Sequence, residues 1–534
     1  MFQVYALEQQ ISQRMQTQKV PGLALALVKD EEIIYARGFG VTSMEEDSNL
    51  PVTPQTLFLI GSTAKPLTGT AIMQLVEAGK LDLDLSVHAY VDWLRFHEKD
   101  AERVITLRML MSHTAGLHSS VNYSGGRDPG ALAAYVQEQI PQRLFVAPPG
   151  KVYFYSNDGL IVAGYIAEVV SGQYFPDLMQ QLVFDPLEMG RTTYDTTGAM
   201  TYPFALEHEW REDGTVHVLH RFVDTMASSP AGPAPMSTVL DLAHFAILHL
   251  NQGKFHGKQI LAPESVKAMH TQHVAFHTVN EAGYGLTFRM ETYKGKQLVW
   301  HNGMAPTTTS IFCLVPEERI GIMMLFNGLF AGFGAPGTVY SLIDQILELP
   351  EHTAEPQFVE PDTTMWPRYS GTYLGARGGL ASIEWTDAGL QLDFNGDIFP
   401  VRALRSGVYV GLNAQGGIHV SVGFISEAGG SVQWITVNGM PMQRFERNTI
   451  FVPDASKWLA YVGTYEAVND SIKVRIEDGQ LLLLDVKDKH EVNCIPLDDT
   501  CFACPLGLIE FVVGDDGIVT EICSAETFHY ARVR

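Results

Sequence analysis

The chain has 534 residues, of which 46% are hydrophobic and 18% are charged, as in ordinary soluble globular proteins. At about 150 residues per domain this length predicts three or four domains, because one hydrophobic core rarely grows so large. Lysine and arginine number 36 against 60 acidic residues, and the net charge of -24 repels nucleic acid and anionic membrane surfaces. We therefore expect neither a nucleic-acid partner nor a membrane partner.

Residues 1–22 lack the basic start, the apolar run and the cleavage site of a secretory signal, and they predict an amphipathic helix instead. No window approaches the roughly 20 consecutive apolar residues of a membrane span. The sequence therefore predicts a cytoplasmic protein.

The cysteines are an odd and sparse set, which favours reduced thiols over a disulfide framework. They are Cys313, Cys494, Cys501, Cys504 and Cys523. Cys501 and Cys504 form a CxxC pair, but no second pair of Cys or His ligands follows at a suitable spacing. We expect no zinc site, no other metal and no cofactor.

Two apolar runs around a polar turn predict a β-hairpin over residues 23–35. From Ser62 the pattern changes to a helical period that closes at Gly79, so Ser62 lies where a helix begins. Long helical stretches are expected up to about residue 190, and strand-like runs return over 284–326. Strands at both ends with helices between them predict one α+β unit whose terminal strands share a sheet.

The composition changes at a polar, proline-bearing stretch near residue 350, which is typical of a linker. Beyond it the chain is rich in glycine and in short alternating strands, an all-β signature. The segment Tyr369-Ser370-Gly371-Thr372-Tyr373 recurs as Tyr461-Val462-Gly463-Thr464-Tyr465, and this repeat predicts two small antiparallel β-barrels. The expected domains are residues 1–348, a linker at 349–360, and barrels at 361–450 and 456–534.

Ser62-Thr63-Ala64-Lys65 opens the first predicted long helix. The three-residue spacing places the hydroxyl and the amine on one face, one turn apart, so that the amine can reach the serine oxygen. A helix N-terminus also stabilises developing negative charge, and the Ser62 N–H can act as an oxyanion donor. Alone, this pattern is common, and most instances are ordinary helix starts.

Two further patterns carry matching chemistry. In Tyr155-Ser156-Asn157, a phenol beside an ammonium can take the serine proton, and the Asn157 amide can bind the substrate and Lys65. His301-Asn302-Gly303 ends a strand, where Gly303 lets a substrate lie close and the Met304 N–H can complete an oxyanion hole. Taken singly, a tyrosine such as Tyr155 is more often a core aromatic residue, and an HxG pattern means little.

In this order the SxxK, YxN and HxG elements resemble the signature of penicillin-binding proteins and class C β-lactamases. Residues 105–117 and 185–190 resemble further segments of that superfamily, and the resemblance extends over about residues 10–345. It implies an α+β catalytic domain with an antiparallel sheet flanked by a helical region. With two C-terminal barrels the architecture resembles the bacterial D-aminopeptidases, whose barrels are lipocalin-like.

The resemblance implies a serine hydrolase that forms an acyl-enzyme on a small-molecule or short-peptide substrate. The implied catalytic residues are Ser62, Lys65, Tyr155 and His301, and the implied substrate contacts are Asn157, Gly303 and Met304. A D-aminopeptidase or D-amino-acid amidase is preferred. A carboxylesterase of this fold, a penicillin-binding-protein-type peptide-cyclising thioesterase and a catalytically inactive ligand-binding protein remain as alternatives, and a homodimer is left open.

His301 stands where β-lactamases usually have lysine, which argues against potent β-lactam hydrolysis. An imidazole there is expected to tune the Lys65–Tyr155 pair, or to orient a substrate carboxylate, in a pH-dependent way near neutrality. The proline-rich stretch 232–238 is expected to be a structural turn. The acidic positions Asp485, Asp488 and Glu491 are a candidate loop for selecting substrates with a free amine, the alternative being an exposed hairpin turn.

Overall fold

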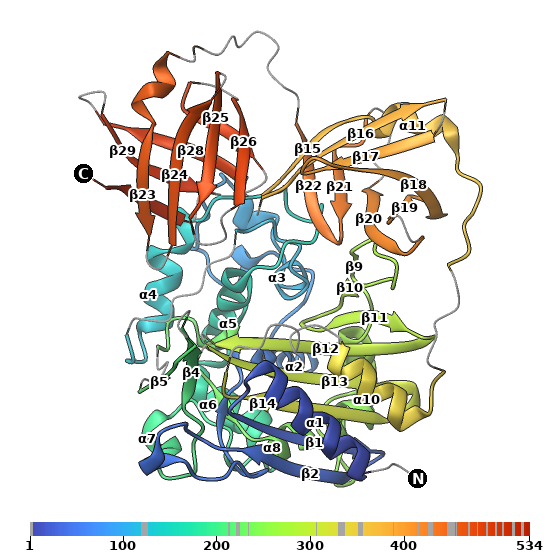
Figure 1. Cartoon of the computed structure of the whole chain (residues 1–534). Coiled ribbons are helices and arrows are strands. Elements are labelled where there is room, and N and C mark those ends of the chain that lie inside the picture. The colour runs from blue at the N-terminus through green and yellow to red at the C-terminus, as the bar shows by residue number, and fades with distance from the viewer. Residues whose placement is uncertain are drawn as a thin grey trace. The chain divides into compact units, whose positions relative to one another are not determined.

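A computed structural model describes residues 4–533 except 119–125, 212–213, 221–224, 233, 306, 329–336, 351–355, 377, 388, 414–415, 426–430, 446–453, 455, 468–469, 478, 487–489, 497–498, 505–506, 515–517 and 525–527. The chain divides into two compact units. One is Met1–Ala275 with Asn280–Ala354, and the other is Phe276–Val279 with Glu355–Arg534. The elements of both are labelled in Figure 1.

An antiparallel sheet organises the first unit, in the strand order β2-β1-β14-β13-β12-β11-β10-β9. Its strands are β1 Gly22–Lys29, β2 Glu32–Gly40, β9 Val274–Ala275, β10 Gly283–Tyr284, β11 Arg289–Tyr293, β12 Lys296–Ala305, β13 Thr308–Val315 and β14 Ile320–Phe326. β1 pairs with β14, Leu23 lying opposite Phe326 and Lys29 opposite Ile320. The predictions of an N-terminal hairpin and of terminal strands sharing one sheet are confirmed.

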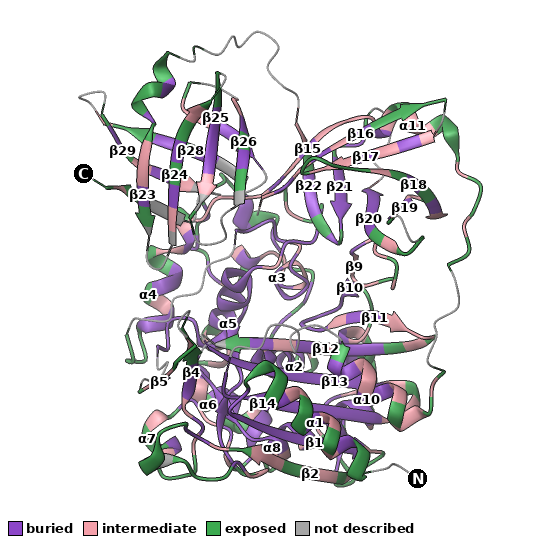
Figure 2. Cartoon of the chain, in the orientation of Figure 1, coloured by how far each residue is buried: buried purple, intermediate pink, exposed green. Residues whose placement is uncertain are grey.

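Strand β1 is buried on both faces. Successive side chains of a strand point to opposite sides of the sheet, so the two faces of β1 pack into different cores. Its alanines enter one hydrophobic core and its leucines the other. Helices α1 (Val4–Gln18) and α10 (Gly337–Leu347) cover the leucine side, and α8 (Val239–Leu250) covers the alanine side. Figure 2 shows the consequence, with β1, β13 and β14 buried along their length.

The helical part of this unit begins with α2 (Ala64–Glu77) and includes α5 (Asn157–Ser171). The expectation of long helices up to residue 190 is wrong for the rest, which are short: α3 Leu107–Met111, α4 Ala131–Glu138 and α6 Phe175–Met179. Glycines with positive φ and prolines without an N–H interrupt the helical hydrogen-bond pattern between them. In the part of the chain that the structure describes, no helix has both the length and the apolar character needed to cross a membrane.

Two closed antiparallel β-barrels make up most of the second unit. The first runs from β15 (Gly371–Gly375) to β22 (Met440–Phe445), and the second from β23 (Gly463–Ala467) to β30 (Phe528–Arg532). Each has eight strands, in sequential order around the barrel. The all-β character and the pair of barrels predicted from the sequence are confirmed.

The repeated sequence does the same structural work in both barrels. In the first, the Tyr373 hydroxyl donates to the Tyr369 carbonyl at 2.6 Å, and the Arg444 guanidinium lies 4.9 Å from the Tyr373 ring centroid. In the second, the Tyr465 hydroxyl donates to the Tyr461 carbonyl at 2.7 Å, and the arginine of the last strand again lies over the ring. The repeat therefore encodes a tyrosine-to-backbone hydrogen bond at the start of each barrel, and the arginine over the tyrosine ring connects this start to the last strand.

Candidate active site

Ser62 lies in a single 3-10 turn, Gly61–Thr63, that leads directly into α2. The turn is held against the sheet by buried hydrogen bonds. The Thr63 and Ser310 hydroxyl oxygens are 2.7 Å apart, and Ser310, on β13, also donates to the Ile60 carbonyl. The serine is thus presented by a rigid turn between a strand and a helix.

Two glycines let this turn approach β12. Gly61 has a φ of +51°, and a Cβ atom there would lie 2.6 Å from the backbone nitrogen of Met304. A Cβ at Gly303 would lie 2.0 Å from the Ile60 carbonyl oxygen and 2.9 Å from the backbone nitrogen of Ser62. These distances are shorter than van der Waals contact, so the close approach of the Ser62 turn to β12 requires glycine at both positions.

The amine of Lys65 is fully buried and lies within hydrogen-bond distance of three oxygen atoms. It is 2.8 Å from Ser62 Oγ, 2.7 Å from Asn157 Oδ1 and 2.6 Å from the Ala231 carbonyl oxygen. Burial, together with the positive charge of Arg289, holds the pKa of Lys65 well below its usual value. In a neutral amine, two N–H groups satisfy the amide and carbonyl oxygens, and the lone pair faces the Ser62 hydroxyl.

Tyr155 approaches the same serine oxygen, to which its hydroxyl donates at 2.8 Å. Its ring lies 4.9 Å from Lys65 Nζ, centroid to nitrogen, and 5.7 Å from the Arg289 guanidinium carbon. Two residues later α5 begins, capped by the Ser156 hydroxyl, and its first residue is Asn157. The turn before the helix therefore places the Tyr155 phenol at Ser62 and the Asn157 amide at Lys65.

His301, on β12, has both ring nitrogens within hydrogen-bond distance of a partner. Nε2 is 2.9 Å from the Tyr284 hydroxyl, and Nδ1 is 2.6 Å from the carbonyl oxygen of Asn302. Burial lowers the pKa of His301 well below its usual value, and the charges of Lys65 and Arg289 lower it further. This environment does not fit the expectation that the imidazole titrates near neutrality, because a proton there would be desolvated close to the Arg289 guanidinium.

The structure brings Ser62, Lys65, Tyr155 and Asn157 into one hydrogen-bonded cluster and places the backbone of Gly303 beside it. The His301 ring lies outside this cluster, its centroid 6.2 Å from that of Tyr155. The Met304 side chain is exposed, so only its backbone belongs to the site.

Sequence reasoning missed four residues around this cluster: Gly61, Ala231, Tyr284 and Arg289. Ala231 immediately precedes the stretch that was expected to be only a structural turn, and no side-chain pattern could have indicated a carbonyl ligand. Gly61, directly before the serine, is a sequence signal for a tight turn.

The structure describes only part of the acidic segment that contains Asp485, Asp488 and Glu491. Asp488 lies outside the described residues, and Glu491 forms an ion pair with Arg475 at 2.5 Å.

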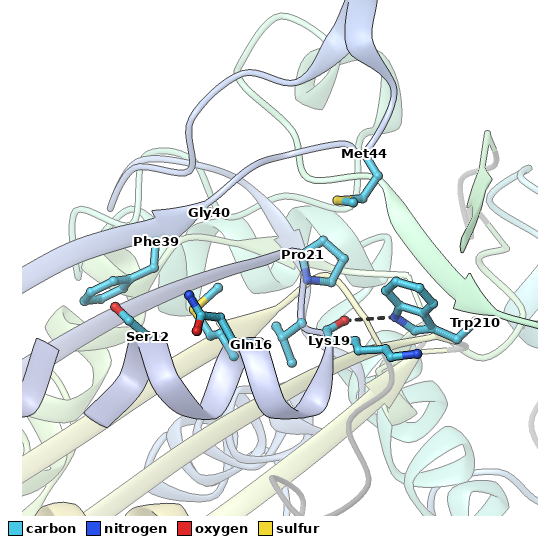
Figure 3. Close-up of a pocket in the computed structure, with 10 residues that line it drawn as sticks. Ser12, Gln16, Lys19, Pro21, Phe39, Gly40, Met44 and Trp210 are labelled. Carbon is cyan, nitrogen blue, oxygen red and sulfur yellow. Dashed lines mark hydrogen bonds between the residues drawn. The ribbon is translucent and has the colours of Figure 1, made fainter. Parts of the chain in front are cut away.

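A separate pocket of about 390 Å³ opens at the C-terminal end of α1 (Figure 3). Its wall includes Phe39, Met44 and Trp210, and the indole N–H donates to the Lys19 carbonyl at 2.9 Å. None of the clustered residues around Ser62 lines it. It is an open, largely apolar surface feature and supplies no group to the Ser62 cluster.

Comparison with known proteins places the chain in a family. The Beta-lactamase family model matches residues 7–341. Penicillin-binding protein 4 of Amycolatopsis lactamdurans is 28% identical over 66% of this chain and 93% of its own length. An unguisins hydrolase of Aspergillus campestris, ungD', is 25% identical, over 64% of each chain, and protein flp of Staphylococcus aureus is 24% identical, over 59% of this chain and 61% of its own.

Solved structures extend the likeness beyond the family model. An octameric penicillin-binding protein homologue from Pyrococcus abyssi has a TM-score of 0.56 at 22% identity, covering 90% of this chain and 98% of its own. SurE has a TM-score of 0.60 at 22% identity, covering 82% of this chain and 98% of its own. At this identity the structures show a shared fold alone. Because the family model spans well over half of the sequence, the chain belongs to the Beta-lactamase family, whose members are typically serine hydrolases.

Proposed function

We propose that this chain is a hydrolase in which Ser62 forms an acyl-enzyme with small amide or peptide substrates, and that it acts as a D-aminopeptidase or D-amino-acid amidase. The observation that carries the mechanism is the convergence of Lys65 Nζ and Tyr155 Oη on Ser62 Oγ, each at 2.8 Å. A serine is a weak nucleophile unless a neighbouring base takes its proton. Both candidate bases are in place.

In the acylation step Ser62 Oγ attacks the substrate carbonyl carbon while its proton moves to the neutral amine of Lys65. Asn157 Oδ1 and the Ala231 carbonyl accept the other two N–H groups, and they stabilise the ammonium that results. The C–N bond then breaks, and the leaving amine takes a proton from Tyr155, which recovers one from Lys65. Water hydrolyses the acyl-enzyme by the reverse proton path.

The oxyanion of the tetrahedral intermediate is stabilised by the backbone N–H groups of Ser62 and Met304 in this scheme. The close approach of the two backbones at Gly61 and Gly303 supports it. Removing one such donor from a hydrolase typically costs about 10²–10³-fold in rate.

A hydrolase reaction and a D-amino-acid ligand each have support from one of the comparisons. One curated relative is an unguisins hydrolase, and SurE, which shares the fold at a TM-score of 0.61, has been solved with D-Leu. Neither likeness fixes the substrate, because a shared fold hosts different chemistries. The carboxylesterase and the peptide-cyclising thioesterase are therefore the outcomes against which the proposal is tested.

The deciding measurement is p-nitroaniline release from D-alanyl and L-alanyl p-nitroanilides by the full chain and by Ser62→Ala. Release from the D form alone, absent in the variant, is expected. No release from either anilide, with Ser62-dependent turnover of p-nitrophenyl acetate or butyrate, would overturn the amidase proposal in favour of an esterase. Transfer of the acyl group to an added amine in preference to water would favour the cyclising thioesterase.

A serine-directed phosphonate tests the nucleophile independently of the substrate. We expect labelling of the full chain and none of Ser62→Ala. Undiminished labelling of the variant would remove Ser62 from the mechanism.

A further inference from the structure

Three buried aromatic side chains from distant parts of the first unit form a hydrogen-bonded chain beside the Ser62 cluster. His113 follows α3, Tyr284 ends β10 and His301 lies on β12. His113 Nε2 is 3.1 Å from the Tyr284 hydroxyl oxygen, which is 2.9 Å from His301 Nε2. None of the three is more than 1% exposed.

The two ends of this chain determine where its protons lie. The backbone N–H of Ser156 points at His113 Nδ1 at 3.2 Å, so Nδ1 accepts and Nε2 carries the proton. At the other end the Asn302 carbonyl can only accept, so His301 Nδ1 carries the proton. His301 Nε2 must then accept from the Tyr284 hydroxyl, whose oxygen in turn accepts from His113. Every link has one donor and one acceptor only in this arrangement.

Protonation of His301 would break this arrangement. A proton on Nε2 would face the Tyr284 O–H, and that hydroxyl could not turn to His113, whose Nε2 already carries a proton. Burial holds the pKa of Tyr284 well above its usual value, so it remains a phenol. A buried donor left without an acceptor costs about 1–3 kcal/mol.

The charged and titratable groups around His301 act in the same direction. They come from five other segments: Lys65 of α2, His113 after α3, Tyr155 before α5, Tyr284 of β10 and Arg289 of β11. Arg289, and Lys65 whenever it is protonated, repel a positive charge on the imidazole. The ring of His113 also packs on that of Tyr155, with centroids 4.4 Å apart, which connects the chain to the phenol at Ser62.

We propose that His113 and Tyr284 are positioning residues that hold His301 as a neutral imidazole in its Nδ1–H tautomer. The role assigned to this neutral ring rests on the proposed Ser62 mechanism. When Lys65 takes the serine proton, it becomes an ammonium, and an imidazolium at His301 would oppose that charge. A ring fixed in the neutral state keeps the acylation step available at mildly acidic pH.

Tyr284→Phe is the informative variant because it removes the hydroxyl and keeps the ring. In full-length protein labelled with ¹⁵N-histidine, two-bond ¹H–¹⁵N spectra report the tautomer and charge of His301, with His301→Gln used for assignment. We expect a neutral Nδ1–H ring from pH 5.5 to 8 in the unmodified chain. In Tyr284→Phe we expect the pKa of the ring to rise, because Nε2 no longer accepts a hydrogen bond from the phenol.

Activity gives a second readout. If Tyr284→Phe lets His301 take up a proton, the imidazolium fraction grows as the pH falls, and kcat/KM should fall more steeply from pH 8 to pH 5.5 than it does in the unmodified chain. Tyr194→Phe is the matched control. It removes a buried hydroxyl for which, among the residues that the structure describes, there is no hydrogen-bond partner, and its pH profile should follow that of the unmodified chain.

An imidazolium or an Nε2–H ring at His301 in the unmodified chain would overturn the proposal, as would an unchanged His301 titration in Tyr284→Phe. The spectra need no substrate, so they decide the matter even if no substrate is turned over. A neutral Nδ1–H ring in a chain without Ser62-dependent chemistry would refute the proposed function and leave the positioning assignment standing.

Discussion

Lys65 Nζ lies 2.8 Å from Ser62 Oγ, one helical turn further along the chain, and it is fully buried. The sequence spacing alone makes this contact available, because positions three apart share a helix face. The chemical state of the amine depends on burial and on Arg289, both supplied by distant segments. The contact between the nucleophile and its base is therefore encoded in a short segment, whereas the pKa of the base depends on distant segments.

Replacing Lys65 with methionine should abolish most of the activity. Methionine fills a similar volume but offers no base, and a positioned base typically contributes about 10²–10⁴-fold to a rate. We expect phosphonate labelling of Lys65→Met to slow by at least about 10²-fold. Labelling at the unmodified rate would show that Tyr155 alone activates the serine.

Replacing Arg289 with glutamine should move the acid limb of the pH profile. The guanidinium is one of the two causes that lower the pKa of Lys65, so its removal raises that pKa towards the usual value. Because the neutral amine is the active form, kcat/KM should then begin to fall at a higher pH than in the unmodified chain. The profile is measured between pH 5 and 9.

Arg289→Lys is the matched control for that experiment, because it keeps a positive charge at nearly the same place. Its acid limb should stay close to that of the unmodified chain. Equal shifts in both variants would mean that the packing of Arg289, and not its charge, sets the pKa.

Sequence reasoning worked where a contact is encoded in a short segment. The YxGTY repeat was readable because each copy makes its own tyrosine-to-carbonyl hydrogen bond four residues apart. The Ser62–Lys65 spacing was readable for the same reason. The prediction of long helices up to residue 190 was wrong because it did not take account of the glycines and prolines that end these helices.

The rest of the site depends on contacts between segments far apart in sequence. Tyr284 reaches a histidine 171 positions earlier in the chain, and the Ala231 carbonyl reaches Lys65 across 166 positions. No periodicity or motif links such residues. The resemblance to a family identified SxxK, YxN and HxG as one ordered set of motifs. It could not show that both ring nitrogens of His301 lie within hydrogen-bond distance of a partner.

Alanine at Gly61 should destroy the site, whereas alanine at Gly79 should only weaken the fold. Both glycines have positive φ, +51° and +68°, so each substitution carries backbone strain of about 1–2 kcal/mol. A Cβ at Gly61 also meets the Met304 backbone, and a Cβ at Gly79 meets nothing within 4 Å. We expect both variants to melt at a lower temperature, and only Gly61→Ala to lose phosphonate labelling.

Comparable loss of labelling in the Gly79→Ala variant would mean that backbone strain just after α2, and not the approach of the Ser62 turn to β12, controls activity.

The tyrosines of the YxGTY repeat should stabilise each barrel separately. Tyr373→Phe deletes the hydrogen bond to the Tyr369 carbonyl and the one accepted from Arg444, and Tyr465→Phe deletes the bond to the Tyr461 carbonyl. Each such bond is worth about 0.5–1.5 kcal/mol. Hydrogen–deuterium exchange should rise in peptides of β15–β22 for the first variant and in peptides of β23–β30 for the second. Unchanged exchange in both would deny the repeat its structural role.

The stability of the first unit should depend on pH through the ionisation of Lys65. Its pKa is lowered in the folded protein, so unfolding at a pH between the folded and unfolded values takes up one proton. The free energy of unfolding therefore rises with pH in that range, by about 1.4 kcal/mol per pH unit for one proton, and this contribution is absent in Lys65→Met. Measured from pH 7 to 9, the melting temperature of the unmodified chain should increase relative to that of Lys65→Met.

Lys296→Met is the control, because Glu318 raises the pKa of Lys296, which stays charged over this range in both states. If Lys65→Met followed the unmodified chain in parallel, the buried amine would have to be an ammonium in the folded state, and Tyr155 rather than Lys65 would be the group that accepts the serine proton.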